Sequence, residues 1–104
     1  MREVDLDSFA AAHAAGAHVI DVREPGEYVD GHVPGARLIP MAQLPSRLHE
    51  LDRDRSVYVV CASGNRSGAM TGLLAQHGFD AVNVAGGTGA WIRSGRPVTQ
   101  GKEA

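Results

Sequence analysis

Residues 56–68 read SVYVVCASGNRSG, and this stretch decides the fold of the chain. Its first five residues are an apolar run of β-branched and aromatic side chains, which is typical of a buried strand. The run stops at Cys61, and small residues with one glycine and one arginine follow before apolar residues recur at helical spacing. A strand, a short loop and a helix in direct succession favour an α/β fold.

The same alternation extends to both sides of this stretch. Helical spacing and capping residues predict helices over 6–15, 67–78 and 87–95, a helical turn over 24–31 and a helix over 45–51. Apolar β-branched runs predict further strands over 18–22, 37–39 and 79–87. The predicted fold is therefore an α/β domain with a parallel sheet that helices cover on both faces.

Length and composition restrict the function. A chain of 104 residues suffices for one core, so we expect a single domain over 1–104. The net charge of −2 is spread without a basic stripe, which argues against nucleic acid as a partner. The sequence contains no apolar stretch of about 20 residues and does not begin like a secretory signal. We therefore expect a cytoplasmic protein without a membrane partner.

The cysteine and histidine content argues against metals and disulfides. The single cysteine, Cys61, cannot form an internal disulfide or a thiolate-rich zinc site by itself. The histidines show no metal-ligand spacing, so no metal site is expected. The value of Cys61, if it has one, lies in its reactivity.

The loop after Cys61 is suited to bind an anion. Backbone N–H groups between a strand and a helix converge on one concavity, with the positive end of the helix dipole behind them. The loop residues expected to form this ring around the Cys61 nucleophile are Ala62, Ser63, Gly64, Asn65, Arg66 and Ser67. Such a ring favours the thiolate and predicts a pKa of Cys61 below the free value of about 8.5.

Two other interpretations of Cys61 exist. A lone cysteine at a strand end is most often a small buried apolar residue, but such a residue does not need the loop that follows. Cysteine phosphatases also place a nucleophile beside an anion loop, for a phosphoryl group with three equatorial oxygens. Here only four residues separate Cys61 from Arg66, one fewer than is typical of those enzymes, which fits a single sulfur atom better.

Two further motifs flank this loop. Residues 21–40 read DVREPGEYVDGHVPGARLIP, and residues 86–91 read GGTGAW. With CASGNRS between them in this order, the sequence resembles the single-domain members of the rhodanese family of sulfurtransferases. The resemblance covers about 18–97 and leaves 98–104 as a tail. It implies a three-layer α/β fold with a mostly parallel central sheet of about five short strands and helices on both faces.

The resemblance implies an enzyme of the thiosulfate:cyanide sulfurtransferase type that needs no cofactor. Cys61 would take a sulfane sulfur from thiosulfate or a related persulfide donor and hold it as a persulfide. A thiol, a protein acceptor or cyanide would then remove it. Many members carry a basic residue directly after the cysteine; Ala62 departs from this pattern, which removes one source of positive field for thiosulfate.

The charged residues near the site have two readings. Arg66 either attracts the anionic donor or braces the loop by pairing with a carboxylate such as Asp21. Asp21 and Arg23 are supporting residues at a strand end, where we expect a surface ion pair of small energetic value.

The remaining motif residues are expected to have structural roles. We expect His32 to be a turn histidine bonded to backbone, Trp91 to pack in the core, and Gly86 and Gly87 to allow close backbone approach. A phosphatase or arsenate reductase on the same scaffold, and a non-catalytic redox-sensing or interaction module, remain alternatives to a sulfurtransferase.

Overall fold

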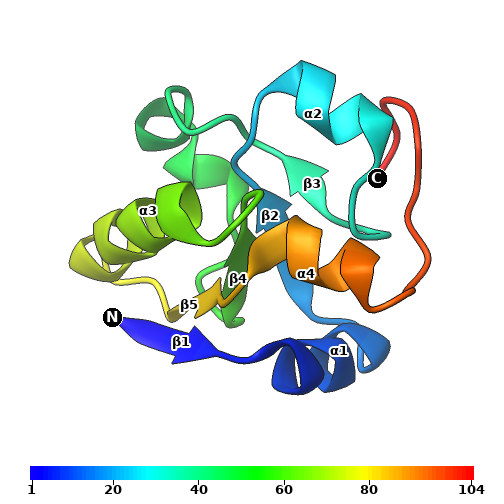
Figure 1. The fold of residues 1–104 in the computed structure, drawn as a ribbon. Coiled ribbons are helices and arrows are strands. Elements are labelled where there is room, and N and C mark those ends of the chain that lie inside the picture. Colours follow the sequence, from blue (N-terminus) through cyan, green and yellow to red (C-terminus); the bar gives the residue numbers. More distant parts are fainter.

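The computed structural model describes residues 1–104 and contains one five-stranded sheet (Figure 1). All neighbouring strands are parallel, in the order β1-β5-β4-β2-β3. The strands are β1 (Arg2–Val4), β2 (His18–Asp21), β3 (Arg37–Leu38), β4 (Val57–Val60) and β5 (Ala81–Val84). The predicted parallel α/β sheet is confirmed.

Helices cover both faces of this sheet, as the sequence predicts. They are α1 (Leu6–Ala14), α2 (Pro25–Asp30), α3 (Asn65–Gln76), α4 (Gly87–Arg93) and two 3₁₀ turns, η1 (Leu44–Ser46) and η2 (Leu48–Glu50). In Figure 1, α3 lies on one side of the strands and α1 with α4 on the other. No helix is long and apolar enough to cross a membrane.

Alternate residues of the strands build two separate cores. Val57 and Val59 of β4 face one cluster, which Leu74 of α3 and Leu44 of η1 complete. Val60 of β4 points the other way, into a second cluster with aromatic residues of α1 and α4. This alternation follows from the two-residue period of a strand that is covered on both faces.

Two elements differ from the sequence prediction. The strand β1 was not predicted, because REV is short and largely exposed; it exists through its pairing with β5, in which Arg2 is aligned with Val82. The helix expected over 45–51 is instead two 3₁₀ turns. Arg47 lies between them with φ −121°, outside the helical region, so a continuous helix cannot form.

Candidate active site

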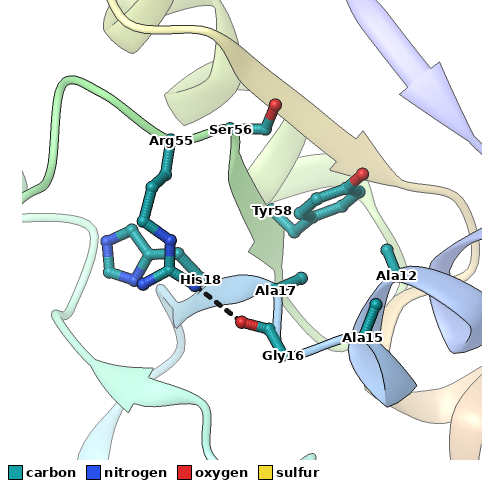
Figure 2. Close-up of a pocket in the computed structure, with 8 residues that line it drawn as sticks. All are labelled: Ala12, Ala15, Gly16, Ala17, His18, Arg55, Ser56 and Tyr58. Carbon is teal, nitrogen blue, oxygen red and sulfur yellow. Dashed lines mark hydrogen bonds between the residues drawn. The ribbon is translucent and has the colours of Figure 1, made fainter.

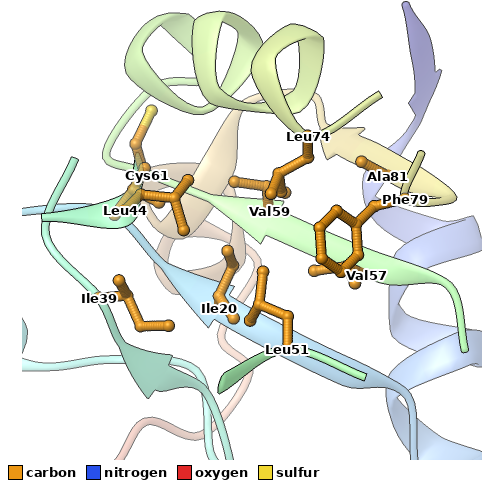
Figure 3. Packing of buried hydrophobic residues seen from close by; sticks show 11 residues of the cluster. Ile20, Ile39, Leu44, Leu51, Val57, Val59, Cys61, Leu74, Phe79 and Ala81 are labelled. Atoms are coloured by element: carbon orange, nitrogen blue, oxygen red, sulfur yellow. The ribbon is translucent and has the colours of Figure 1, made fainter. Parts of the chain in front are cut away.

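Cys61 lies at the carboxyl end of β4, the central strand of the sheet. Figure 3 shows it at one end of the first core cluster, with its sulfur directed toward the α3 side of the sheet. The residue is only 1% exposed, so it lies deeper than a loop-mouth position suggests.

Backbone N–H groups nevertheless face this sulfur. The amide N of Gly64 donates to Cys61 Sγ at 3.1 Å. Burial raises the pKa of the Cys61 thiol, but hydrogen bonds lower it more: one from the Ser67 hydroxyl when its proton points at the sulfur, and others from the backbone N–H groups of Ser67, Gly64 and Ser63. The pKa therefore lies below its ordinary value, and the thiolate is favoured.

The loop turns into α3 at Gly64. Gly64 has φ +105° and stands at the N-cap of α3, a backbone conformation that other residues rarely adopt. Asn65 and Arg66 form the first turn of the helix, two residues earlier than predicted. Ser63 and Asn65 are exposed and Ala62 is half-buried, so these three form the outer wall of the loop.

Ser67 and Asn83 form a polar chain behind the sulfur. The Ser67 hydroxyl lies 3.3 Å from Cys61 Sγ and 2.6 Å from Asn83 Oδ1. Asn83 Nδ2 donates to Glu3 Oε2 at 2.7 Å and to the Gly64 carbonyl at 3.3 Å. Asn83 was not predicted as a site residue, although an amide in the otherwise apolar strand AVNV is a usable signal, since buried polar groups have partners.

Arg66 braces the loop by pairing with a carboxylate of α2. Its guanidinium donates to the two Glu27 carboxylate oxygens at 2.8 and 2.9 Å. This hydrogen-bonded pair lowers the pKa of Glu27 to about 2 and raises that of Arg66. The partner is Glu27 and not Asp21. Glu27 was not predicted as a site residue. It lies in the first turn of α2, where it forms a capping box with Glu24.

Asp21 and Arg23 form a buried ion pair, so the expectation of a surface pair was wrong. Their side chains are 0% and 7% exposed, and Arg23 donates to both carboxylate oxygens of Asp21. Arg23 also donates to the Gly31 carbonyl at 2.9 Å. This bond places the end of α2, whose C-cap is Gly31, beside the pair. The pair ties this strand to the end of α2 and does not contact the sulfur by a hydrogen bond.

The GGTGAW motif binds the Cys61 loop through backbone hydrogen bonds. Thr88 N donates to the Cys61 carbonyl at 2.8 Å, and Gly89 N donates to the Ala62 carbonyl at 2.9 Å. Gly87 has φ +56°, and a Cβ there would collide with the Cys61 carbonyl oxygen. The expected close backbone approach is present, and the first turn of α4 fixes the loop carbonyls.

His32 and Trp91 take structural positions. The two ring nitrogens of His32 contact the carbonyls of Tyr28 and Glu103 at 2.8 and 2.7 Å. Trp91 is 3% exposed in the second core, and its Nε1 donates to the Pro97 carbonyl. Neither ring has a hydrogen bond to Cys61.

The surface pocket of this protein lies elsewhere. It has a volume of about 300 Å³ and is drawn in Figure 2. Its lining residues are Ala12, Ala15, Gly16, Ala17, His18, Arg55, Ser56 and Tyr58. His18 and Ser56 stand at the starts of β2 and β4, so the pocket opens at the amino ends of the strands, opposite Cys61.

Comparison with known proteins agrees with this architecture. A family model described as "Rhodanese-like domain" matches residues 5–94. A protein named sulfurtransferase from Allochromatium vinosum is 36% identical over 94% of each chain, and a putative sulfurtransferase from Bacillus subtilis is 39% identical over 77% of this chain and 78% of its own. The crystal structure of a rhodanese-related protein from Thermoplasma volcanium superposes with a TM-score of 0.91 at 36% identity, covering 97% of this chain and all of that one.

Proposed function

Because the chain belongs to the rhodanese-like domain family, whose relatives here are named sulfurtransferases, we propose that it transfers sulfane sulfur through a persulfide on Cys61. The donor is a small molecule with a terminal sulfur, and the acceptor is a thiol on a small molecule or a protein. No metal or organic cofactor takes part in the proposed chemistry.

The proposed reaction has two displacements at sulfur. The Cys61 thiolate attacks the terminal sulfur of the donor and forms an S–S bond. The bond between that sulfur and the rest of the donor breaks, and its electron pair leaves with sulfite, if the donor is thiosulfate, or with a thiolate, if it is a persulfide. An acceptor thiolate then attacks the outer sulfur, and Cys61 leaves as a thiolate.

The observation that carries the proposal is the hydrogen bond from Gly64 N to Cys61 Sγ, with its lowering effect on the pKa of the thiol. A buried apolar cysteine would not need N–H groups directed at its sulfur. Preorganised donors of this kind stabilise an anionic nucleophile, and the leaving thiolate of the second step, without rearrangement.

The depth of the sulfur favours sulfur transfer over the alternatives. A cysteine that is only 1% exposed suits a donor that reaches its sulfur with one terminal atom better than a tetrahedral phosphate ester. Redox-sensing cysteines are usually accessible to solvent, which disfavours a sensor. Arg66 is paired with Glu27, and Ala62 carries no charge, so we propose that a persulfide serves better than dianionic thiosulfate.

Intact-mass spectrometry tests this proposal. The protein is incubated with thiosulfate or with glutathione persulfide, desalted, and compared with the Cys61→Ser variant. The expected result is a gain of one sulfur atom in the wild type only, which a small thiol then removes. No gain, or an equal gain in Cys61→Ser, would falsify it, and Cys61-dependent turnover of an aryl phosphate would favour the phosphatase.

A further inference from the structure

The Ser67 hydroxyl has one proton and two neighbours that can accept it. Cys61 Sγ lies 3.3 Å from Ser67 Oγ, and Asn83 Oδ1 lies 2.6 Å from it. A hydroxyl donates one hydrogen bond at a time and accepts up to two. The direction of this proton therefore decides whether Ser67 supports the thiol or the thiolate of Cys61.

The surroundings of Asn83 fix the direction of its amide. Its Nδ2 faces the Glu3 carboxylate and the Gly64 carbonyl, and both of these groups only accept. Turning the amide over would bring Oδ1 against two acceptors. Oδ1 must therefore face Ser67, and since a carbonyl oxygen has no proton, the 2.6 Å contact requires that Ser67 donate.

We propose that Asn83 is a positioning residue that holds the hydroxyl proton of Ser67 on its own amide oxygen, and so keeps this donor away from the sulfur of the free cysteine. With the proton there, Ser67 offers Cys61 a lone pair, which accepts from the neutral S–H group. The free thiolate receives the backbone N–H groups but gains the hydroxyl only when the bond to Asn83 breaks. Asn83 therefore opposes the part of the pKa lowering that comes from the Ser67 hydroxyl.

The bond from Ser67 to Asn83 does not destabilise Cys61 in its persulfide form, a statement that rests on the proposed function. In a persulfide the negative charge lies on the outer sulfur, one S–S bond of about 2 Å beyond Sγ. The inner sulfur then needs neither a donor nor an acceptor from Ser67, which keeps its bond to Asn83. Asn83 therefore favours the sulfur-loaded state over the empty thiolate.

The charges around the loop come from several elements. They are Arg66 of α3 with Glu27 of α2, Asp21 of β2 with Arg23, and Glu3 of β1. Only Glu3 loses a hydrogen-bond partner when Asn83 is replaced, and it does so with or without the Ser67 hydroxyl. A shift on replacing Asn83 is therefore assigned to the Ser67 proton once the background without the hydroxyl has been subtracted.

The test is the pH dependence of Cys61 alkylation by iodoacetamide, which needs no sulfur donor and so is independent of the proposed transfer. Four proteins form a double-mutant cycle: wild type, Asn83→Leu, Ser67→Ala and the double variant. In Asn83→Leu the hydroxyl is free to donate to the thiolate, and we expect the midpoint to fall by about one pH unit. In the Ser67→Ala background the same change has no effect.

Two results would overturn the inference. One is a midpoint that rises or does not move in Asn83→Leu, which would mean that Ser67 already donates to the sulfur. The other is an equal fall in both backgrounds, which would mean that Asn83 acts through the packing of the loop. The same fall of the midpoint is expected for Asn83→Ala. This variant replaces Asn83→Leu if thermal melting shows that the larger side chain prevents folding.

Discussion

Replacement of Gly87 by alanine should separate the loop from α4. Gly87 lies under the Cys61 loop, where an added Cβ would overlap the Cys61 carbonyl oxygen and stand 3.0 Å from the carbonyl carbon and oxygen of Ala62. These are backbone atoms at the end of a central strand, so they cannot move aside as a flexible side chain would. The helix and the loop must move apart.

The magnitude follows from three contributions. A left-handed backbone conformation, here φ +56°, costs an alanine about 1–2 kcal/mol. Separation breaks the hydrogen bonds from Thr88 N and Gly89 N to the loop carbonyls, each with a net value of about 0.5–1.5 kcal/mol. Together the variant should lose about 2–5 kcal/mol, a large part of the roughly 5–15 kcal/mol of a typical domain.

Urea unfolding measures this loss, and Gly95→Ala is the matched control. Gly95 also has a positive φ, +81°, but a Cβ there meets nothing within 4 Å. Its variant should therefore lose only the conformational cost, about 1–2 kcal/mol. Alkylation of Cys61 near neutral pH should slow in Gly87→Ala but not in Gly95→Ala, because a displaced loop no longer directs its N–H groups at the sulfur and so favours the thiolate less. Equal stability losses in the two variants, with unchanged alkylation, would refute the close approach.

Three further outcomes are expected. Glu27→Gln should remove the ion pair with Arg66 and the pH-dependent stability that it contributes. The Glu27 pKa falls to about 2 on folding, so the pair stabilises the fold fully above about pH 4.5, and this stabilisation is lost as pH falls toward 2. Because both side chains are about one-third exposed, we expect a loss of only about 1 kcal/mol at neutral pH, and acid unfolding curves that differ less between the two proteins as pH falls. Asp21→Asn should cost about 3–5 kcal/mol in urea unfolding, because it leaves the charge of Arg23 buried and unpaired; a cost below 1 kcal/mol would contradict the burial. Trp91→Phe keeps most of the core contact but loses the indole donor to the Pro97 carbonyl, so its melting temperature should be lower than that of the wild type. An equal melting temperature would contradict a role for this bond.

The sequence predicts the sheet and the position of Cys61 well because those features rest on local patterns. Apolar β-branched runs mark β2 and β4, and the small residues after Cys61 mark a tight loop before a helix. Gly86 and Gly87 likewise predict a close approach of two backbone segments before the last helix. Each of these signals lies in a few consecutive residues of the chain.

The features that sequence analysis missed depend on contacts between distant segments. Glu27 meets Arg66 across 39 positions, and Glu3 meets Asn83 across 80. A carboxylate in a helical turn reads as a solvent-exposed charge until the partner is known. The pair of Asp21 with Arg23 was predicted, but its burial was not, since burial depends on how later segments such as the end of α2 at Gly31 fold back onto it.

The place of β4 in the middle of the sheet has a consequence for the motions of the protein. In parallel sheets the outer strands exchange their amide hydrogens first, and here these are the three-residue β1 and the two-residue β3. Opening of either leaves β4 paired with β2 and β5 on its two sides. The strand that leads to Cys61 therefore keeps both of its neighbours during such partial unfolding, and the reactive thiol stays at the end of an ordered strand.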